Sequence, residues 1–211
     1  MRRVRDAAVV GSPDLYFKQI SVGYMGNFVY LIGDKKVKEC AVVDPAWDVD
    51  AILKEAEKDG MKVVAGILTH THFDHANGVE ALVEKTGAKI YVHANEAKFL
   101  KDVASKQLIE TKEGFTLKIG AVEMIFLHTP GHTEGAQCIQ VGEKLVTGDT
   151  LFVGACGRCD LPGGDEKKLM QSLKRLAGLD GSLQVFPGHA YGEADSSTIG
   201  NERRTNPFMK F

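Results

Sequence analysis

Three histidines and one aspartate lie within six residues, in the segment Thr-His-Thr-His-Phe-Asp-His that covers residues 69–75. Imidazole nitrogens and a carboxylate oxygen together suit Zn²⁺, Fe²⁺ or Mn²⁺, and no nearby cysteine indicates a structural zinc site. In an extended chain His70, His72 and Asp74 would share one side, while His75 would face another way. We therefore expect the segment to serve two neighbouring cations better than one.

Three further segments share one form, in which a short apolar strand leads into a glycine-bearing turn that exposes one ligand-type side chain. These side chains are His132, Asp149 and His189. Because strands are rigid, a side chain at a strand end is held in a fixed position. Four such strand ends that converge on one cavity would form a site, so we expect these three residues to join the cluster at 70–75.

A pair of cations with these ligands would activate water. The pKa of water falls from about 15.7 in bulk to about 7 on a zinc ion, so hydroxide becomes available near neutral pH. Such a hydroxide can attack a carbonyl group that the same ions polarise. The sequence has no Gly-x-Ser-x-Gly turn, so it does not support the chemistry of a serine hydrolase.

Short runs of β-branched and aromatic residues predict the strands that position these turns. The expected strands cover residues 16–22, 28–33, 41–44, 63–69, 89–93, 122–128, 136–141, 144–147 and 183–186. Apolar residues at spacings of three and four predict helices between some of the strands. The expected helices cover residues 48–59, 77–85 and 165–176, with a shorter and weaker one over 96–103.

The order of these elements is not the strict alternation of strand and helix that a doubly wound sheet requires. Strands come first, then strands alternate with helices, then a cluster of strands follows, and a strand–helix alternation ends the chain. This order predicts two sheets covered by outer helices. The sequence contains no long repeat and no Pro/Ser-rich linker, so we expect a single domain over residues 1–211.

Charge and composition exclude several classes of protein. The 211 residues include 26 Lys and Arg and 28 Asp and Glu, a net charge of −2, so the basic footprint of a nucleic-acid binder is missing. No apolar run approaches the roughly 20 residues of a membrane-spanning helix, and the basic N-terminal stretch 1–14 lacks the apolar run of a signal peptide. We expect neither a nucleic-acid nor a membrane partner.

The four cysteines, Cys40, Cys138, Cys156 and Cys159, are too few for a disulfide scaffold and favour free thiols in a reducing cytoplasm. Cys156 and Cys159 have the C-x₂-C spacing, but a zinc ribbon needs a second pair. A reversible disulfide between these two cysteines stays open, as does the oligomeric state.

The set His70, His72, Asp74, His75, His132, Asp149 and His189 resembles the metal-ligand signature of the metallo-β-lactamase superfamily. The resemblance runs from about Phe17 to the C-terminus. It implies an α/β fold, the αβ/βα sandwich of two mixed sheets flanked by helices, with the metals at one edge. It also implies a first metal on His70, His72 and His132, and a second on Asp74, His75 and His189. Asp149 would bridge the two metals, and Asp74 would orient the nucleophile and shuttle its proton.

The segment 148–158, together with 69–78 and 187–191, is similar to glyoxalase II, also called hydroxyacylglutathione hydrolase. The resemblance implies a thioesterase that cleaves S-acylglutathione-type substrates with a hydroxide held between two metal ions. Zinc is the expected metal, and iron or manganese would also suit the ligands. Arg158 and Tyr191 match the positions that contact the glutathione part. Only about 20 residues follow Tyr191, so we do not expect the additional helical domain of glyoxalase II, and the ending at 196–208 resembles that of small single-domain relatives.

Two other functions remain as alternatives. Persulfide dioxygenase resembles the chain in its fold and in Gly157–Asp160, and it would hold one Fe²⁺ on the residues that match His70, His132 and Asp149. The chain departs from that family at three places, which are Phe73, the pair Leu161-Pro162, and Phe208, which stands where that family has an arginine. The other alternative is a non-catalytic metal-binding module. A secreted β-lactamase fits less well, since the chain has an aspartate at Asp149 where such enzymes have a cysteine ligand.

Overall fold

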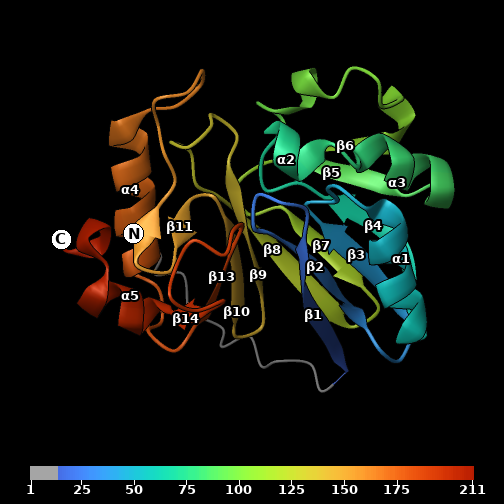
Figure 1. Cartoon of the computed structure of the whole chain (residues 1–211), viewed down its shortest axis with the longest axis horizontal. Coiled ribbons are helices and arrows are strands. Elements are labelled where there is room, and N and C mark those ends of the chain that lie inside the picture. Colours follow the sequence, from blue (N-terminus) through green and yellow to red (C-terminus); the bar gives the residue numbers. More distant parts are fainter. Residues whose placement is uncertain (1–13) are drawn as a thin grey trace, which may run out of the picture.

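A computed structural model describes residues 14–211, so the basic N-terminal stretch lies almost wholly outside the described residues. Two sheets pack face to face in the centre of the molecule, and helices cover the outer face of each sheet (Figure 1). This arrangement confirms the predicted α/β sandwich with two mixed sheets and flanking helices.

The first sheet contains six strands, β1 (Leu15–Val22), β2 (Asn27–Asp34), β3 (Glu39–Val43), β4 (Lys62–Ile67), β5 (Lys89–His93) and β6 (Leu108–Thr111), which follow one another in that order. The pairs β1–β2 and β2–β3 are antiparallel, and the remaining pairs are parallel. Every residue of β2 is buried, which explains its continuous apolar run, because a strand covered on both faces has no polar side.

The second sheet has the order β14-β13-β10-β9-β8-β7 and is also mixed, since only β10 and β13 pair in parallel. Its strands are β7 (Thr116–Ile119), β8 (Val122–His128), β9 (Gln137–Val141), β10 (Lys144–Gly148), β13 (Gln184–Pro187) and β14 (Ser197–Thr198). A separate hairpin of β11 (Leu151–Phe152) and β12 (Ala155–Cys156) follows β10.

The helices are α1 (Val49–Lys58), α2 (Phe73–Ala76), α3 (Val79–Thr86), α4 (Glu166–Ala177) and α5 (Ile199–Thr205), with single 3₁₀ turns at η1 (Ala97–Phe99), η2 (Ser105–Gln107) and η3 (Pro207–Met209). Side chains cap three of the helices at the N-terminus: Asp48 for α1, Asp165 for α4 and Thr198 for α5. Each accepts a hydrogen bond from a backbone N–H of the first turn that would otherwise lack a partner.

Three apolar clusters correspond to the layers. One lies between the first sheet and α1 and α3, and it includes Ile52 and Leu82. The second lies between the two sheets, where Tyr30 and Phe126 are fully buried. The third joins the second sheet to α4 and α5 through residues such as Leu173. The packing of both sheets holds the strand ends at one edge in fixed relative positions, which is what a site at that edge requires.

The weak helix expected over residues 96–103 is wrong, because the structure has only the 3₁₀ turn η1 there. Glu96 is buried and accepts hydrogen bonds from Thr71 and Gly135, so tertiary contacts decide the path of this segment rather than helix propensity. The short strands β6, β7 and β14 and the hairpin β11–β12 were not expected either. No helix within residues 14–211 is long and apolar enough to cross a membrane.

Candidate metal centre

The loops that follow β4, β8, β10 and β13 meet at one edge of the two sheets and bring all seven expected ligands together. His70, His75, His132, Asp149 and His189 are buried, and His72 and Asp74 are half-buried. These residues come from four loops that lie up to 119 positions apart in the chain, so the folded structure builds the cluster as the sequence predicted.

Three imidazoles form the first group, and their inward nitrogens converge. Nδ1 of His72 lies 3.1 Å from Nε2 of His70 and 2.9 Å from Nε2 of His132. The rings meet edge to face, with centroids 4.6–4.8 Å apart. This geometry directs three nitrogen lone pairs at one point.

The second group consists of Asp74, His75 and His189. Nε2 of His75 lies 3.1 Å from Nε2 of His189, and Oδ2 of Asp74 lies 3.3 Å from the latter and 3.6 Å from the former. The expectation that Asp74 continues the extended alternation of His70 and His72 is wrong. The helical turn α2 begins at Phe73, and it carries the Asp74 carboxylate to the second group.

Asp149 lies between the two groups. Its Oδ1 is 3.4 Å from Nε2 of His75, and its Oδ2 is 3.4 Å from Nε2 of His189 and 3.7 Å from Nε2 of His132. Oδ1 is buried and has no hydrogen-bond partner. A buried carboxylate oxygen without a donor is costly unless a cation or proton neutralises it, so Asp149 is well placed to face two cations at once.

The residues fit a pair of divalent cations. With zinc–nitrogen bonds of about 2.0–2.1 Å, two ligands of a tetrahedral ion lie about 3.3 Å apart. The separations within and between the groups, 2.9–3.7 Å, bracket that value. Two groups of imidazole and carboxylate donors that share one aspartate therefore suit zinc, iron or manganese.

The outward nitrogens of four imidazoles have hydrogen-bond acceptors. Nδ1 of His132 donates to the carbonyl of Arg158 (2.7 Å), and Nδ1 of His189 donates to the carbonyl of Met25 (3.1 Å). For His75 the acceptor is a carboxylate oxygen of Asp44, at 3.0 Å, and for His70 it is the hydroxyl of Thr69, at 3.1 Å. These contacts place the ring proton outward and leave the inward nitrogen free for a metal.

Asp44 is a supporting residue that the sequence reasoning missed. It follows the apolar strand β3 and adopts a positive φ of 54°, and its carboxylate accepts hydrogen bonds from the backbone N–H and hydroxyl of Thr69, each at 2.7 Å. It therefore holds the loop that carries His70 and also orients His75. The sequence does contain a signal that could have identified Asp44, since Asp44 follows an apolar strand just as the ligands do.

Asn27 and Trp47 support Asp74. The amide of Asn27 donates to Oδ2 of Asp74 at 3.0 Å and accepts a hydrogen bond from the indole N–H of Trp47 at 2.9 Å. Trp47 is not among the site residues that the sequence predicted. The structure adds that its indole fixes the amide that orients Asp74, a contact across 20 positions that spacing alone does not reveal.

Glu96 links two of the ligand-bearing loops. It is buried, and one carboxylate oxygen accepts hydrogen bonds from the backbone N–H (3.1 Å) and hydroxyl of Thr71, between His70 and His72. The other oxygen accepts from the backbone N–H of Gly135, three residues beyond His132, at 2.9 Å. Glu96 therefore fixes the two loops of the first group relative to each other.

Two glycines are required by close packing at the centre. Gly148 precedes Asp149 and has a φ of 49°, and a Cβ there would collide with the side chain of Thr69. A Cβ at Gly188, next to His189, would collide with Oδ1 of Asp149. Only glycine allows the backbone to approach the centre so closely.

The two groups differ in their protonation. Burial lowers the pKa of His70 well below its usual value and lowers the pKa of His72, and neighbouring imidazoles add to the effect. Burial also opposes the charged form of His75 and His189, but nearby carboxylates outweigh it. The pKa of His75 is raised well above its usual value by Asp149 and Asp44, and that of His189 rises to about 9 through Asp149 and Asp74.

This difference predicts unequal pH dependence for the two metal ions. At pH 7 His70 and His72 are neutral, whereas His189, with a pKa of about 9, carries a proton that a metal must displace. We expect the affinity for the second Zn²⁺ to rise about tenfold or more per pH unit from pH 6.5 to 8.5, and that for the first to change much less. Competition with a chromophoric chelator measures both affinities, and equal slopes for the two ions would contradict the prediction.

Arg158 and Tyr191 lie beside the centre, at the surface. The guanidinium of Arg158 is 62% exposed and forms a two-pronged contact with Asp160, at 2.7 and 2.6 Å. The ring of Tyr191 stacks on that of His189, with centroids 4.4 Å apart. Ion pairs between exposed side chains are weak, so another carboxylate can replace Asp160 as the partner of Arg158 at little cost.

A family model for the metallo-β-lactamase superfamily matches residues 22–189 of the chain. The hydroxyacylglutathione hydrolase of Pseudomonas entomophila is 31% identical, over 89% of this chain and 83% of that protein. A protein of Bacillus subtilis named "Probable polyketide biosynthesis zinc-dependent hydrolase PksB" is 33% identical, over 85% of this chain and 81% of that protein. The crystal structure of ETHE1 from Myxococcus xanthus superposes with a TM-score of 0.83 and 30% identity, over 91% of this chain and 83% of that one.

Proposed function

The chain belongs to the metallo-β-lactamase superfamily, whose members are mostly metal-dependent hydrolases, and we propose that it is a thioesterase of the glyoxalase II type. The substrate is a small-molecule thioester, an acyl group linked to glutathione or a similar thiol. The similarity to a hydroxyacylglutathione hydrolase supports this choice, as does the ligand set described above.

In this proposal the first group, His70, His72 and His132, holds one divalent cation, and Asp74, His75 and His189 hold another. Asp149, which approaches both groups, would be shared by the two cations. When bound, the two cations would polarise the thioester carbonyl and lower the pKa of water. Zinc is the metal we expect, and the ligands also accept iron or manganese.

The protein's own residues would then orient the attacking water and accept its proton. Asp74 has one oxygen, Oδ2, between His75 and His189, and Asn27 holds the side chain by a hydrogen bond to that oxygen. We assign Asp74 the role of orienting the attacking water and accepting its proton. The pKa of Asp74 is well below its usual value, because His189, His75 and Asn27 outweigh the effect of burial, so the carboxylate is ionised and can accept.

The observation that carries the proposal is the position of Asp149 between the two groups. Its Oδ2 approaches His132 of the first group and His189 of the second, and its Oδ1 approaches His75. A mononuclear persulfide dioxygenase would need only His70, His132 and Asp149, and it would leave Asp74, His75 and His189 without a role in ligation. Their complete and convergent arrangement favours two cations and hydrolysis.

The experiment that tests the proposal combines metal analysis with two assays on the protein purified without added metal. The thioesterase predicts two metal ions per chain and hydrolysis of S-lactoylglutathione. A single iron per chain, with O₂ consumption in the presence of glutathione persulfide, would replace the thioesterase by the dioxygenase. Metal binding with neither activity would favour the non-catalytic module.

Arg158 and Tyr191 are proposed to hold the glutathione part. We expect Arg158→Ala and Tyr191→Phe to raise KM for S-lactoylglutathione about tenfold for the arginine and less for the tyrosine, with kcat changed less than KM. The physical reason is that a carboxylate contact remote from the carbonyl stabilises substrate and transition state equally. Steady-state kinetics measure both constants. Asp160→Asn is the matched control, since it frees Arg158 and should leave KM unchanged or lower it. An unchanged KM in Arg158→Ala would exclude this role.

A further inference from the structure

The hairpin β11–β12 lies against the metal centre, although it contributes no ligand. It begins two residues after Asp149 and ends two residues before Arg158, whose carbonyl accepts the hydrogen bond from His132. The ring of Phe152 meets that of His189 edge to face, with centroids 6.0 Å apart. The position of the hairpin therefore bears on the shared aspartate and on one histidine of each group.

The packing around the hairpin is close. A Cβ at Gly157, directly after the hairpin, would collide with the carbonyl oxygen of Asp149. A Cβ at Gly192 would collide with the carbonyl oxygen of Val153 in the turn of the hairpin. Since Gly192 follows Tyr191, a displaced hairpin would shift both Asp149 and the loop that carries Tyr191.

The hairpin cannot fix its own position. Each of its strands has only two residues, and it belongs to neither of the two six-stranded sheets. A two-stranded hairpin that stands alone is at best marginally stable in water. Contacts from other elements must therefore hold it.

Two polar residues of the C-terminal segment supply such contacts. Glu202 on α5 and Asn206 directly after α5 are fully buried. Oε2 of Glu202 accepts a hydrogen bond from the backbone N–H of Gly154 at 2.8 Å, and Nδ2 of Asn206 donates to the carbonyl of Ala155 at 2.9 Å. The same Nδ2 also donates to Oε2 of Glu202 at 2.9 Å. The pair thus binds the turn of the hairpin through both its N–H and its C=O groups.

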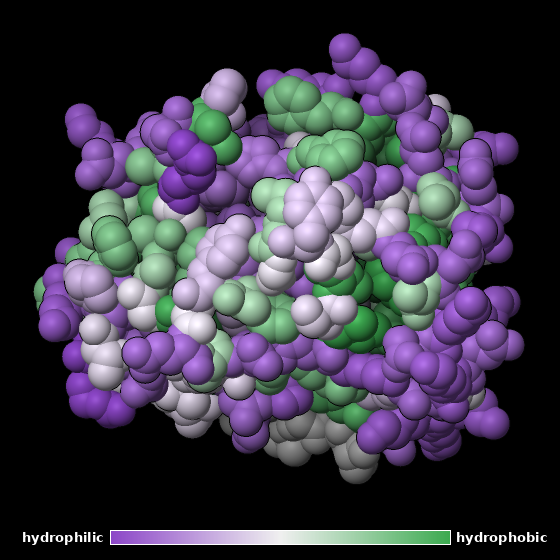
Figure 2. Space-filling view, in the orientation of Figure 1, coloured by the Kyte–Doolittle hydropathy of each residue, from purple (hydrophilic) through white to green (hydrophobic). Residues whose placement is uncertain are grey.

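This polar pair lies in a layer that is otherwise apolar. The third apolar cluster, with Leu173 and Ile199, fills the space between the second sheet, α4 and α5, and Figure 2 shows apolar side chains even at the surface over α4, on the left of both views. Within residues 14–211 no cationic side chain pairs with Glu202, whose carboxylate accepts hydrogen bonds from Gly154, Asn206 and Ser197. Because buried polar groups are costly unless they are hydrogen-bonded, these contacts account for the presence of Glu202 here.

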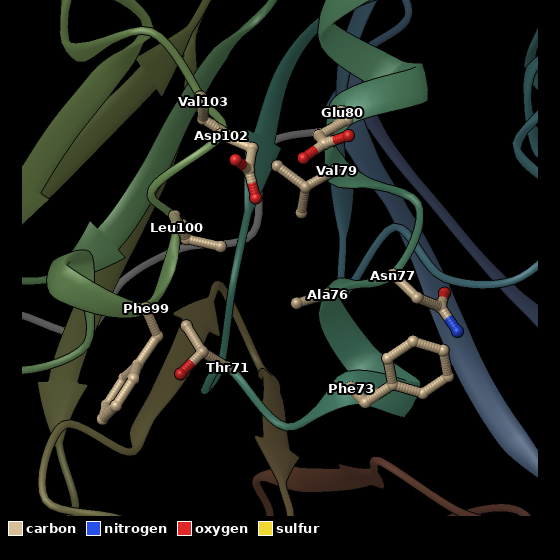
Figure 3. A pocket seen from close by; sticks show the side chains of 10 residues that line it. All are labelled: Thr71, Phe73, Ala76, Asn77, Val79, Glu80, Phe99, Leu100, Asp102 and Val103. Atoms are coloured by element: carbon tan, nitrogen blue, oxygen red, sulfur yellow. The ribbon is translucent and has the colours of Figure 1, made fainter.

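Glu96 has a similar role on the other side of the centre. It is buried, and its carboxylate accepts hydrogen bonds from the backbone N–H groups of Thr71 and Gly135. Thr71 also lines a pocket of about 430 Å³ between α2, α3 and residues 97–103 (Figure 3), and none of the seven ligands lines that pocket. On both sides, a buried carboxylate that is not a ligand holds the backbone next to the ligands.

We propose that Glu202 and Asn206 are positioning residues for the reaction. They hold the hairpin β11–β12, and through it Asp149, the carbonyl that orients His132, and the ring that packs on His189. The effect on hydrolysis rests on the proposed thioesterase function, whereas the effect on metal binding does not depend on the substrate. The C-terminal segment thus belongs to the centre without supplying a ligand.

The first test removes the carboxylate. We expect Glu202→Ala to lower the affinity for the first Zn²⁺ at least about tenfold, because His132 loses its fixed orientation, and to lower kcat for S-lactoylglutathione at saturating Zn²⁺ about 10–100-fold. Competition with a chromophoric chelator and steady-state kinetics measure these effects. Asp34→Ala is the matched control, since Asp34 is also a buried carboxylate that accepts backbone N–H bonds, from Lys36 and Ala121. It should lose stability but keep Zn²⁺ affinity and kcat within twofold.

The second test separates hydrogen bonding from bulk and charge. Glu202→Gln retains an oxygen for Gly154 and Asn206, and its amide can donate to the hydroxyl of Ser197, which accepts as well as donates. We expect this variant to keep Zn²⁺ affinity and kcat within about threefold of the wild type. Asn206→Asp keeps the size of the side chain but loses the donor to Ala155 and places a second carboxylate beside Glu202, so it should behave like Glu202→Ala.

Failure of the inference and failure of the proposed function give different results. If the wild type hydrolyses the thioester and Glu202→Ala and Asn206→Asp both keep Zn²⁺ affinity and kcat within twofold, the two residues only stabilise the fold and the inference is wrong. It is also wrong if Asp34→Ala lowers both quantities as much as they do. If the wild type hydrolyses no thioester, the proposed function fails, and the Zn²⁺ affinities alone decide the inference. If Glu202→Ala does not fold, Asn206→Asp and Glu202→Gln carry the comparison.

Discussion

Replacing Asp149 by alanine should lower the metal content from two ions per chain to one or none and reduce thioester hydrolysis more than about a thousandfold. Among residues 14–211, Asp149 is the only carboxylate that approaches both groups of imidazoles, at 3.4 Å from His75 and His189 and 3.7 Å from His132. Its removal takes away a ligand from each site and the negative charge between two cations. Metal analysis by mass spectrometry and a thioesterase assay on the same preparation measure both effects.

Two variants separate the loss of this charge from a loss of the fold. Asp149→Asn retains the shape of the side chain and should still lose most of the activity, because an amide carries no charge. Asp34→Asn is a matched control, since Asp34 is also buried but accepts its hydrogen bonds from Lys36 and Ala121, outside the centre. This control should lose stability and retain two metal ions. Full activity with two metal ions in Asp149→Ala would show that the bridging assignment is wrong.

Replacing His75 or His189 by alanine distinguishes the proposed thioesterase from the dioxygenase. In the proposed thioesterase both histidines bind the second cation, since their Nε2 atoms lie 3.1 Å apart and both face Asp74. We therefore expect His75→Ala and His189→Ala each to lower the metal content from two toward one and to reduce hydrolysis well over a hundredfold. In a mononuclear dioxygenase the same residues would only support the ligands, and such changes typically cost about 10–100-fold.

The control for these variants is His128→Ala. His128 stacks on His93 with ring centroids 4.0 Å apart and does not belong to any of the groups that can bind metal. It should leave both metal content and hydrolysis unchanged. If the wild type holds one iron, His75→Ala and His189→Ala keep that iron, and the protein consumes O₂ with glutathione persulfide, then the dioxygenase is the correct function.

Much of the fold was predictable from the chain alone. Short runs of β-branched and aromatic residues identify nine of the strands, because such side chains pack well on the buried faces of a sheet. The helices α1, α3 and α4 follow from apolar residues at spacings of three and four. The short strands β6, β7 and β14 and the hairpin β11–β12 escaped notice, since short strands with few buried residues leave little periodic signal.

The donor residues of the centre could also be recognised in the sequence. Clustered histidines and aspartates are rare, and each of these segments follows an apolar strand. A histidine or aspartate directly after a buried strand is held at a sheet edge whatever the rest of the fold does. That is why all seven ligand-type residues were identified before the folded chain brought them together.

Composition and spacing could not reveal which of these residues meet, a grouping that only the family resemblance implied, and they could not reveal what supports the residues. His75 faces His189 across 114 positions, and Glu96 joins the loops of His70 and His132 from a segment whose periodicity predicted a helix. Periodicity reports which side of an element is buried, but the pairing of distant loops depends on the order of strands in both sheets. Asp44, Asn27 and Glu96 can support the centre only because tertiary packing places their segments beside the loops that carry the histidines and aspartates.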